Sequence, residues 1–195
     1  MRIATFLFLG FLLSAARAWA LTLPVSEDSS SCLDWKIAKT AGKEPMITVS
    51  ASRNGLVRFD VGAFATSERP ADVSHARLVI YFCKVRKPGN VTVHRVTQDW
   101  SEHLTAGEPR IPDHDPVPLA TIVTPRGLAK QFAVIDVTET VRGWLSDSAS
   151  DFGFALVSQK GSANVLIGAK EGPATGFPAT LEIETGGGLG QMNVD

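Results

Sequence analysis

The sequence predicts an all-β fold, an antiparallel β-sandwich that is jelly-roll-like and has one short capping helix. Short segments rich in β-branched and aromatic residues recur along the chain, and most are bounded by Gly, Pro, Asn, Asp or Ser. Tight turn sequences separate several of these segments. Strand and helix patterns do not alternate, so we do not expect a parallel α/β sheet.

The first 20 residues have the pattern of a secretory signal peptide. "MRIATFLFLGFLLSAARAWA" has a basic start at Arg2, an apolar run over 3–13 and a small-x-small end at 18–20. The run is too short for a comfortable membrane span, and no later segment approaches the roughly 20 apolar residues that a span needs. We therefore expect cleavage after Ala20 and a secreted protein, extracellular or periplasmic, without a transmembrane segment.

Residues 21–184 are predicted to form a single β-sandwich domain. About 175 residues remain after the signal, enough for one sizeable core. The signal holds two arginines and no acidic residue, so its removal takes the formal net charge from −1 to −3. A chain without a global basic field is not typical of nucleic-acid binding, and we expect no nucleic-acid partner.

Eight segments account for the predicted strands. In "GLVRFDV" apolar and charged residues alternate, as in a strand with one buried face. The segments are 46–50, 55–61, 76–82, 90–96, 131–137, 152–159, 164–170 and 179–184. "KPGN" at 87–90 predicts a hairpin between the third and fourth of these, and "KGSAN" at 160–164 predicts another between the sixth and seventh.

One helix is expected, within "VIDVTETVRGW". Asp136 is placed to cap its start, and Glu139 three residues later would complete a capping box. One helical face then holds Val137, Val141, Trp144 and Leu145. We expect this face to close an open end of the sandwich.

Two segments are predicted to be irregular. Residues 101–130 hold five prolines and only "LATIV" as a candidate strand, and a long irregular segment inside a domain is usually a functional loop or an insertion. Residues 185–195 are Gly-rich, and we expect a flexible tail.

A succession of motifs over 57–184 resembles the DNRLRE, or disaggregatase-related, domain family. In order, the motifs are "GLVRFDVGAF", "ADVSHARLVIYF", "VTVHRVTQDWSE", "VIDVTETVRGWLSDSASDFGFALVSQ" and "FPATLEIE". The resemblance implies a β-sandwich module of secreted and cell-surface proteins, similar to carbohydrate-binding modules, one of which is linked to alginate. The segment at 31–50 departs from the family pattern because it lacks the usual opening strand.

The positions that match the family pattern are interpreted mainly as fold determinants. They are Arg58, Phe59, Asp60, Trp100, Glu102, Asp136, Thr138, Val141, Trp144 and Gly153. Arg58 and Asp60 share one side of their strand. Arg58 could bind a ligand carboxylate bidentately; we favour the structural alternative, in which the pair ties the rim of the sandwich to Asp136 or to a loop carbonyl.

Basic residues are the favoured ligand contacts. "KVRKPGN" brings Lys84, Arg86 and Lys87 close to one turn, where they could contact uronate or sulfate groups. The alternative is a solubilising edge, with lysine preventing strand addition. Exposed Trp or Tyr platforms for neutral sugars are scarce, and Trp35 is the freest candidate because Trp100 and Trp144 are expected in the core or rim.

Two further features of the sequence are candidate sites. Cys32 and Cys83 could form a disulfide in an oxidising compartment, and a buried free thiol is the alternative. The 99–115 segment is dense in carboxylates and imidazoles: Asp99, Glu102, His103, Asp113, His114 and Asp115. If a metal binds there, a structural Ca²⁺ held by Asp113 and Asp115 is the better interpretation, since oxygen ligands predominate; the alternative is solvated loop charge, because no metal-site spacing is present. We expect no other cofactor.

The favoured function is a secreted or surface-exposed, non-catalytic module that binds carbohydrate, most plausibly an acidic polysaccharide. A second hypothesis is a structural or adhesive protein of the envelope or matrix without glycan specificity. A stand-alone polysaccharide-degrading enzyme is a third. The sequence has no G-x-S-x-G elbow, and neither cysteine has a histidine nearby in the sequence, so we favour a protein without catalytic residues.

Overall fold

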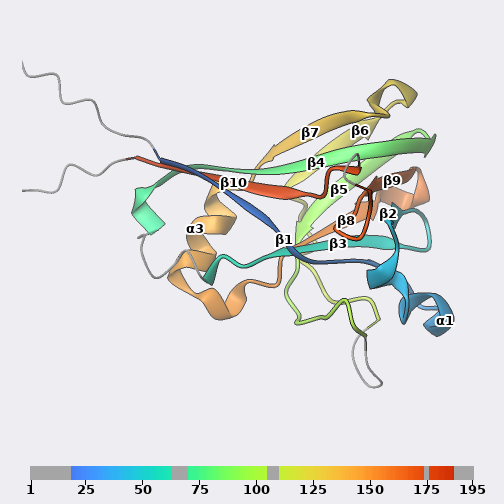
Figure 1. Cartoon of the computed structure of the whole chain (residues 1–195), viewed down its shortest axis with the longest axis horizontal. Coiled ribbons are helices and arrows are strands. Elements are labelled where there is room, and N and C mark those ends of the chain that lie inside the picture. The colour runs from blue at the N-terminus through green and yellow to red at the C-terminus, as the bar shows by residue number, and fades with distance from the viewer. Residues whose placement is uncertain (1–18, 63–69, 105–109, 174–175, 187–195) are drawn as a thin grey trace, which may run out of the picture.

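Two antiparallel sheets face each other in the computed structural model, which describes residues 19–62, 70–104, 110–173 and 176–186 (Figure 1). Sheet A contains β2 (Met46–Val49), β9 (Asn164–Gly168), β4 (Val73–Lys87), β7 (Gln131–Asp136), β10 (Thr180–Thr185) and the first half of β1 (Trp19–Ser31). Sheet B contains the second half of β1, β3 (Asn54–Phe59), β8 (Phe154–Ser158), β5 (Gly89–Arg95) and β6 (Ala120–Thr124). The predicted all-β, antiparallel sandwich is confirmed.

The core lies between the sheets and follows the two-residue period of the strands. In β10 every second residue is buried, so that Leu181 and Ile183 point inward. Leu78, Ile80 and Phe82 of β4 are likewise fully buried. Phe59 and Phe154 of sheet B join the same cluster, with their rings edge to face at 6.4 Å between centroids. The outer faces of β4 and β10 are thereby left for the surface, whereas β5, β8 and β9 have buried residues on both faces.

Strand β1 joins the two sheets and was not predicted from the sequence. Its residues 19–24 pair with β10, and residues 25–31 pair with β3. A register shift lies between Val25 and Glu27, where an extra residue bends a strand and re-aims its side chains. The second half, "SEDSSS", has no apolar alternation because Asp28 and Ser30 are buried polar residues, so the usual strand signal is absent.

The two predicted hairpins are wrong. Strand β4 pairs with β7, β9 and β10, whereas β5 pairs with β6 and β8. The chain therefore crosses from sheet A to sheet B at Pro88, and it crosses back after β8 through residues 159–163. The two crossings pack together: the Asn90 amide donates to Ser162 Oγ at 3.0 Å. Turn residues mark a change of direction, and they do not determine whether the next strand joins the same sheet.

Helix α3 (Thr138–Ser146) covers one end of the sandwich, as predicted, and the short helix α1 (Trp35–Ala38) lies at the other end (Figure 1). Asp136 Oδ1 accepts hydrogen bonds from the Thr138 amide at 2.9 Å and from Thr138 Oγ1 at 2.7 Å. Thr138 Oγ1 accepts from the Ala76 amide of β4 at 2.9 Å, which anchors the helix start to sheet A. The predicted capping box is wrong, because Glu139 pairs with Arg142 at 2.6 Å instead.

The Pro-rich segment is more regular than predicted. "LATIV" contributes to β6, which pairs with β5 from Ala120 to Thr124. A single turn of 3-10 helix at Arg126–Leu128 then leads into β7. At the C-terminal end, β10 includes Thr185, and most of the predicted tail, 187–195, lies outside the described residues.

Replacing Trp144 tests whether helix α3 stabilises the fold by closing one end of the core. Its side chain is fully buried against Phe154, with ring centroids 4.9 Å apart. Trp144→Ala should lower the free energy of unfolding by about 3–5 kcal/mol because it leaves a large cavity. Trp144→Phe should cost much less, because the indole N–H has no hydrogen-bond partner among the described residues. Urea unfolding followed by circular dichroism measures both, and a loss below about 1 kcal/mol for Trp144→Ala would contradict this role.

Candidate functional site

The three predicted basic residues form an exposed ridge at the C-terminal end of β4. Lys84, Arg86 and Lys87 are all exposed, while Val85 between them points into the core. None of the three has a carboxylate partner in the described part of the chain. Arg77, near the other end of β4, differs because it pairs with Glu184 at 2.6 Å. This basic ridge therefore presents charges that no described side chain neutralises.

A groove of about 590 Å³ lies on the outer face of sheet A, next to the ridge along β4. Tyr81 and Phe177 line it, with ring centroids 4.9 Å apart. Phe132 of β7 is the cross-strand partner of Tyr81 and packs on both rings, at 4.9 Å and 5.5 Å between centroids. Lys130 and Cys83 also line the groove. We call this feature the aromatic groove.

Two residues of the aromatic groove have backbone conformations that are rare for residues other than glycine. The φ angle is +64° at Lys130 and +44° at Phe177, in the left-handed region where a side chain is strained. The Lys130 amide donates to the Phe82 carbonyl of β4 at 2.7 Å, which fixes one wall. On the other side, Gly168 of β9 packs against the Gly176 and Phe177 carbonyls so closely that a Cβ there would collide with them. The fold thus holds both residues in place.

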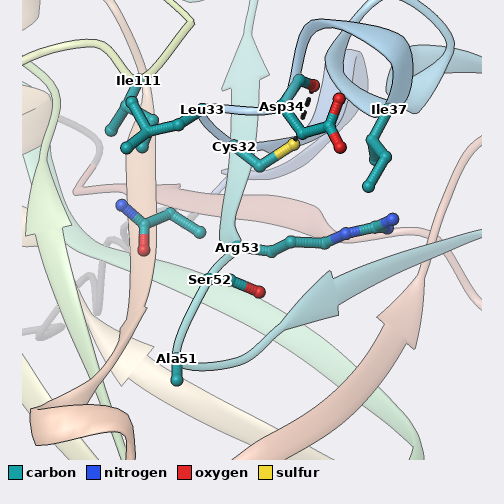
Figure 2. A pocket seen from close by; sticks show the side chains of 9 residues that line it. Cys32, Leu33, Asp34, Ile37, Ala51, Ser52, Arg53 and Ile111 are labelled. Carbon is teal, nitrogen blue, oxygen red and sulfur yellow. Dashed lines mark hydrogen bonds between the residues drawn. The ribbon is translucent and has the colours of Figure 1, made fainter.

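A second groove, of about 630 Å³, lies at the α1 end of the sandwich. Figure 2 shows Cys32, Leu33 and Asp34 on one side of it and Ser52 and Arg53 on the other. The Arg53 guanidinium is 3.0 Å and 3.1 Å from the two carboxylate oxygens of Glu44, so its charge is already matched. The Asp34 carboxylate accepts the Lys36 amide at 2.9 Å as a helix cap. Both charged groups of this end groove therefore serve the fold.

Trp35 stands beside the end groove and not in the aromatic groove. It is the first residue of α1 and is 37% exposed. The Arg110 guanidinium lies over its ring, 5.9 Å from the centroid. The exposure that the sequence suggested for Trp35 is present, but part of the ring is used by an arginine of the Pro-rich segment.

Arg58 has the structural surroundings expected of it, with partners different from those predicted. Its guanidinium contacts Asp99 at 2.6 Å and Glu27 at 3.3 Å. It also lies 5.1 Å from the ring centroid of Trp100 and 5.9 Å from that of Phe152. Neither Asp136 nor a loop carbonyl is among these partners. Asp60 follows the end of β3 and is exposed.

Two buried carboxylates converge on Lys170. Glu102 is 8% exposed, and its oxygens lie 2.7 Å and 2.8 Å from Lys170 Nζ. Asp28 is 1% exposed and accepts the Lys170 backbone amide at 2.7 Å. Burial raises the pKa of Asp28 to about 7, and the charges of Glu171 and Glu102 act in the same direction. These contacts fasten the chain just after β9, three residues before Pro173 of the aromatic groove.

The acidic and histidine residues of 99–115 do not gather into one site. Asp115 pairs with Arg95 at 2.8 Å, while Asp113 is exposed. His114 packs edge to face on the buried His94, at 4.8 Å between ring centroids, and His103 lies 3.6 Å from Glu102. Within the described ranges no group of three or more His, Cys, Asp or Glu residues is placed to hold a metal ion. The proposed calcium ligands therefore have no site around them in this part of the chain.

Both cysteines are free thiols, so the disulfide that the sequence allowed is not formed. Cys32 is buried at the end groove, and its thiol donates to the Asp34 carbonyl at 3.5 Å. Cys83 lines the aromatic groove, and its thiol donates to the Gly176 carbonyl at 3.7 Å. Burial raises the pKa of the Cys83 thiol.

Comparison with known families identifies the chain. Residues 36–185 match carbohydrate-binding module family 96, and the chain belongs to this family. The predicted carbohydrate-binding module is thereby confirmed, while the narrower resemblance to the DNRLRE domain stays a prediction. A search of curated proteins found no significant match. No helix in the described ranges is both long and apolar enough to cross a membrane.

The sequence did not predict the aromatic groove, because the expectation was limited to single exposed Trp and Tyr residues. Its two lining rings come from β4 and from the segment before β10, and a ring of β7 packs on both. A weak signal existed in "QFAVID", where Phe132 and Val134 fall on the face opposite to the buried Ile135. Only the register that sets Tyr81 opposite Phe132 brings the rings together.

The pKa of Asp28 makes stability depend on pH. The pKa is about 7 in the folded protein against 3.8 for the free side chain, so folding takes up a proton between about pH 4 and pH 7. The free energy of unfolding should therefore fall as the pH rises through this window, by at most about 4 kcal/mol. Asp28→Asn keeps an acceptor for the Lys170 amide and should remove this part of the slope. Urea unfolding of both proteins from pH 4.5 to 7.5 measures the difference, and parallel profiles would contradict it.

Proposed function

We propose that this protein is a secreted, non-catalytic module that binds an acidic polysaccharide through the basic ridge. The observation that carries the proposal is that Lys84, Arg86 and Lys87, close together on one strand of a carbohydrate-binding module, have no carboxylate partner among the described residues. The Lys87 ammonium group donates to the Gly161 carbonyl at 3.3 Å, which leaves its charge uncompensated. Unpaired cations on a rigid strand attract uronate or sulfate groups, and arginine binds such groups bidentately.

The attraction is local, since the protein as a whole is not basic. The net charge is −1 for the full sequence, so long-range steering by total charge does not favour a polyanion. The ridge offers three cations within four consecutive residues, and a strand advances by about 3.3 Å per residue. Several anionic groups of one polymer chain can therefore contact the ridge together.

The proposal of a non-catalytic role agrees with the engagement of three carboxylates in the fold. Glu102 is buried against Lys170, and Asp115 is paired with Arg95. Asp28 lies in the interior, with 1% of its surface exposed. A glycosidase needs two carboxyl groups flanking the scissile bond, and these three are committed to the fold.

Export is tested by the N-terminus of the secreted protein. The signal pattern of residues 1–20 should lead to cleavage after Ala20, so that the mature chain begins at Leu21. Such a chain keeps all of β1 except its first two residues. Intact-mass measurement of material collected outside the cytoplasm decides this, and a mass that includes residues 1–20 would refute cleavage.

Removing the ridge should weaken polysaccharide binding without unfolding the protein. We expect the variant Lys84→Ala/Arg86→Ala/Lys87→Ala to lose affinity for alginate and pectate and to keep its melting temperature, because exposed charges contribute little to stability. Wild-type binding should also fall as salt rises, since the Debye length shrinks from about 10 Å at 0.1 M to about 3 Å at 1 M. Calorimetric titration and melting curves measure these effects, with a neutral glucan as the uncharged comparison.

The matched control is a triple alanine variant at Lys36, Lys39 and Lys43, which are exposed at the α1 end. It removes the same number of positive charges as the ridge variant. This control should bind as wild type does. Equal loss in both variants would mean that only net charge matters, which would refute a site on the ridge. Arg58→Ala should instead lower the melting temperature, because Arg58 bridges Glu27 and Asp99.

A further inference from the structure

We propose that the aromatic groove holds one uronate ring of the polysaccharide, with the apolar face of the sugar on Tyr81 and Phe177 and its carboxylate on Lys130. This inference rests on the proposed function and adds a second subsite to it. The basic ridge then contacts the neighbouring part of the same polymer, because Cys83 of the groove and Lys84 of the ridge are consecutive in β4.

The shape and chemistry of the groove suit a sugar ring. Its volume of about 590 Å³ lies in the range of small-ligand sites, which are concave, largely apolar and carry a few polar groups. One face of a pyranose presents C–H groups, which lose contact with water when they lie on an aromatic ring. Phe177 and Phe132 remain 45% and 51% exposed, so their ring surface is available to a ligand.

The charge of the groove favours an acidic sugar over a neutral one. Lys130 is the charged residue among those that line it, and its side chain has no partner among the described residues. The two acidic residues nearest to the groove walls in sequence are engaged elsewhere: Glu44 with Arg53 at 3.0 Å and Glu171 with Lys170 at 3.7 Å. No described residue that lines the groove is acidic, so a carboxylate bound there contacts a cation and no lining anion.

The backbone strain supports a ligand site. Lys130 and Phe177 both adopt positive φ, and such conformations persist only where the surrounding fold imposes them, often at binding sites. In the proposed complex, Lys130 supplies the cation that contacts the carboxylate, and Phe177 supplies a ring that contacts the sugar. A groove held in shape before binding loses little entropy on binding.

A second copy of this chain is the competing occupant, and the charge distribution argues against it. A two-fold contact would place like surfaces together, so the unpaired cations of the groove and ridge, Lys130 and Lys84 foremost, would approach their own copies. A polyanion neutralises the same charges. Dimerisation is therefore an outcome that would overturn the proposal.

The test uses oligomers of mannuronate or guluronate of four to six residues, each compared with the same oligomer after reduction of its carboxyl groups. Phe132→Ala/Phe177→Ala should weaken binding of both forms roughly tenfold or more, a loss of about 1.4 kcal/mol or more. Lys130→Gln should weaken binding of the charged form only. The matched control is Val134→Ala: Val134 is 59% exposed on the same outer face, but it neither lines the groove nor supports its rings, whereas Phe132 packs on both Tyr81 and Phe177.

Cys83 supplies a readout that needs no mutation. It lines the groove, so a bound sugar should slow its alkylation by N-ethylmaleimide at pH 8.5, measured on its own peptide by mass spectrometry. Cys32, which is buried at the end groove, serves as the internal control: it should react slowly, at a rate that the sugar does not change. Protection of Cys83 by the charged oligomers, together with the losses above, would support the proposal.

Two results separate failure of this inference from failure of the proposed function. If the ridge variant loses binding while Phe132→Ala/Phe177→Ala binds as wild type and Cys83 is not protected, the groove proposal is wrong and the proposed function stands. If wild type binds no acidic oligomer or polysaccharide, both are wrong. A wild-type dimer in sedimentation experiments that Phe132→Ala/Phe177→Ala converts to a monomer would also overturn the proposal, by assigning the groove to self-association.

Discussion

The contacts of Lys170 hold together three segments that are far apart in the sequence. Its backbone amide binds Asp28 of β1, and its ammonium group binds Glu102 in the loop after β5 and the Ser26 carbonyl. Removing the Lys170 ammonium group would be costly, because the buried Glu102 carboxylate would be left without a compensating charge. Because Lys170 lies three residues before Pro173, which lines the aromatic groove, these contacts also position that side of the groove. The position of a surface feature on sheet A thus depends on buried charges at the junction of the two sheets.

Local sequence patterns predicted most strands and failed where the sheets are connected. Alternating and β-branched segments such as "ARLVIYF" have one buried face wherever they are placed, so their pattern survives in any sandwich. Strand β1 has no such pattern in its second half, since Ser30 is buried and accepts the Thr48 amide at 2.7 Å. The order of strands is set by which inner faces pack together, and that is a property of the whole chain. For this reason the positions of the turns were predicted correctly, whereas the two predicted hairpin pairings were wrong.

The candidate site was predictable in its charges and not in its aromatic part. Lys84, Arg86 and Lys87 are neighbours in sequence, so their proximity on one exposed strand end needs no tertiary information. Tyr81 and Phe177 are separated by 96 positions in the sequence, and no spacing rule connects them. The roles of Trp100 and Trp144 in the interior were predictable because an indole beside strand or helix periodicity is usually buried. The partners of Arg58 were not, because Glu27 lies on the unpredicted strand.

Ridge and groove would contribute differently to recognition of one polymer. Contacts of exposed lysines with anionic groups are screened by salt, and they tolerate many arrangements of the ligand. Contacts with Tyr81 and Phe177 are short-ranged and depend on the shape of the ring, so they are little affected by salt. On the proposed assignment the ridge sets the preference for a polyanion, and the groove selects among acidic sugars by the orientation of the ring relative to its carboxylate. The strained backbone at Phe177 is consistent with this division, because selection by shape requires a ring that does not move to fit other ligands.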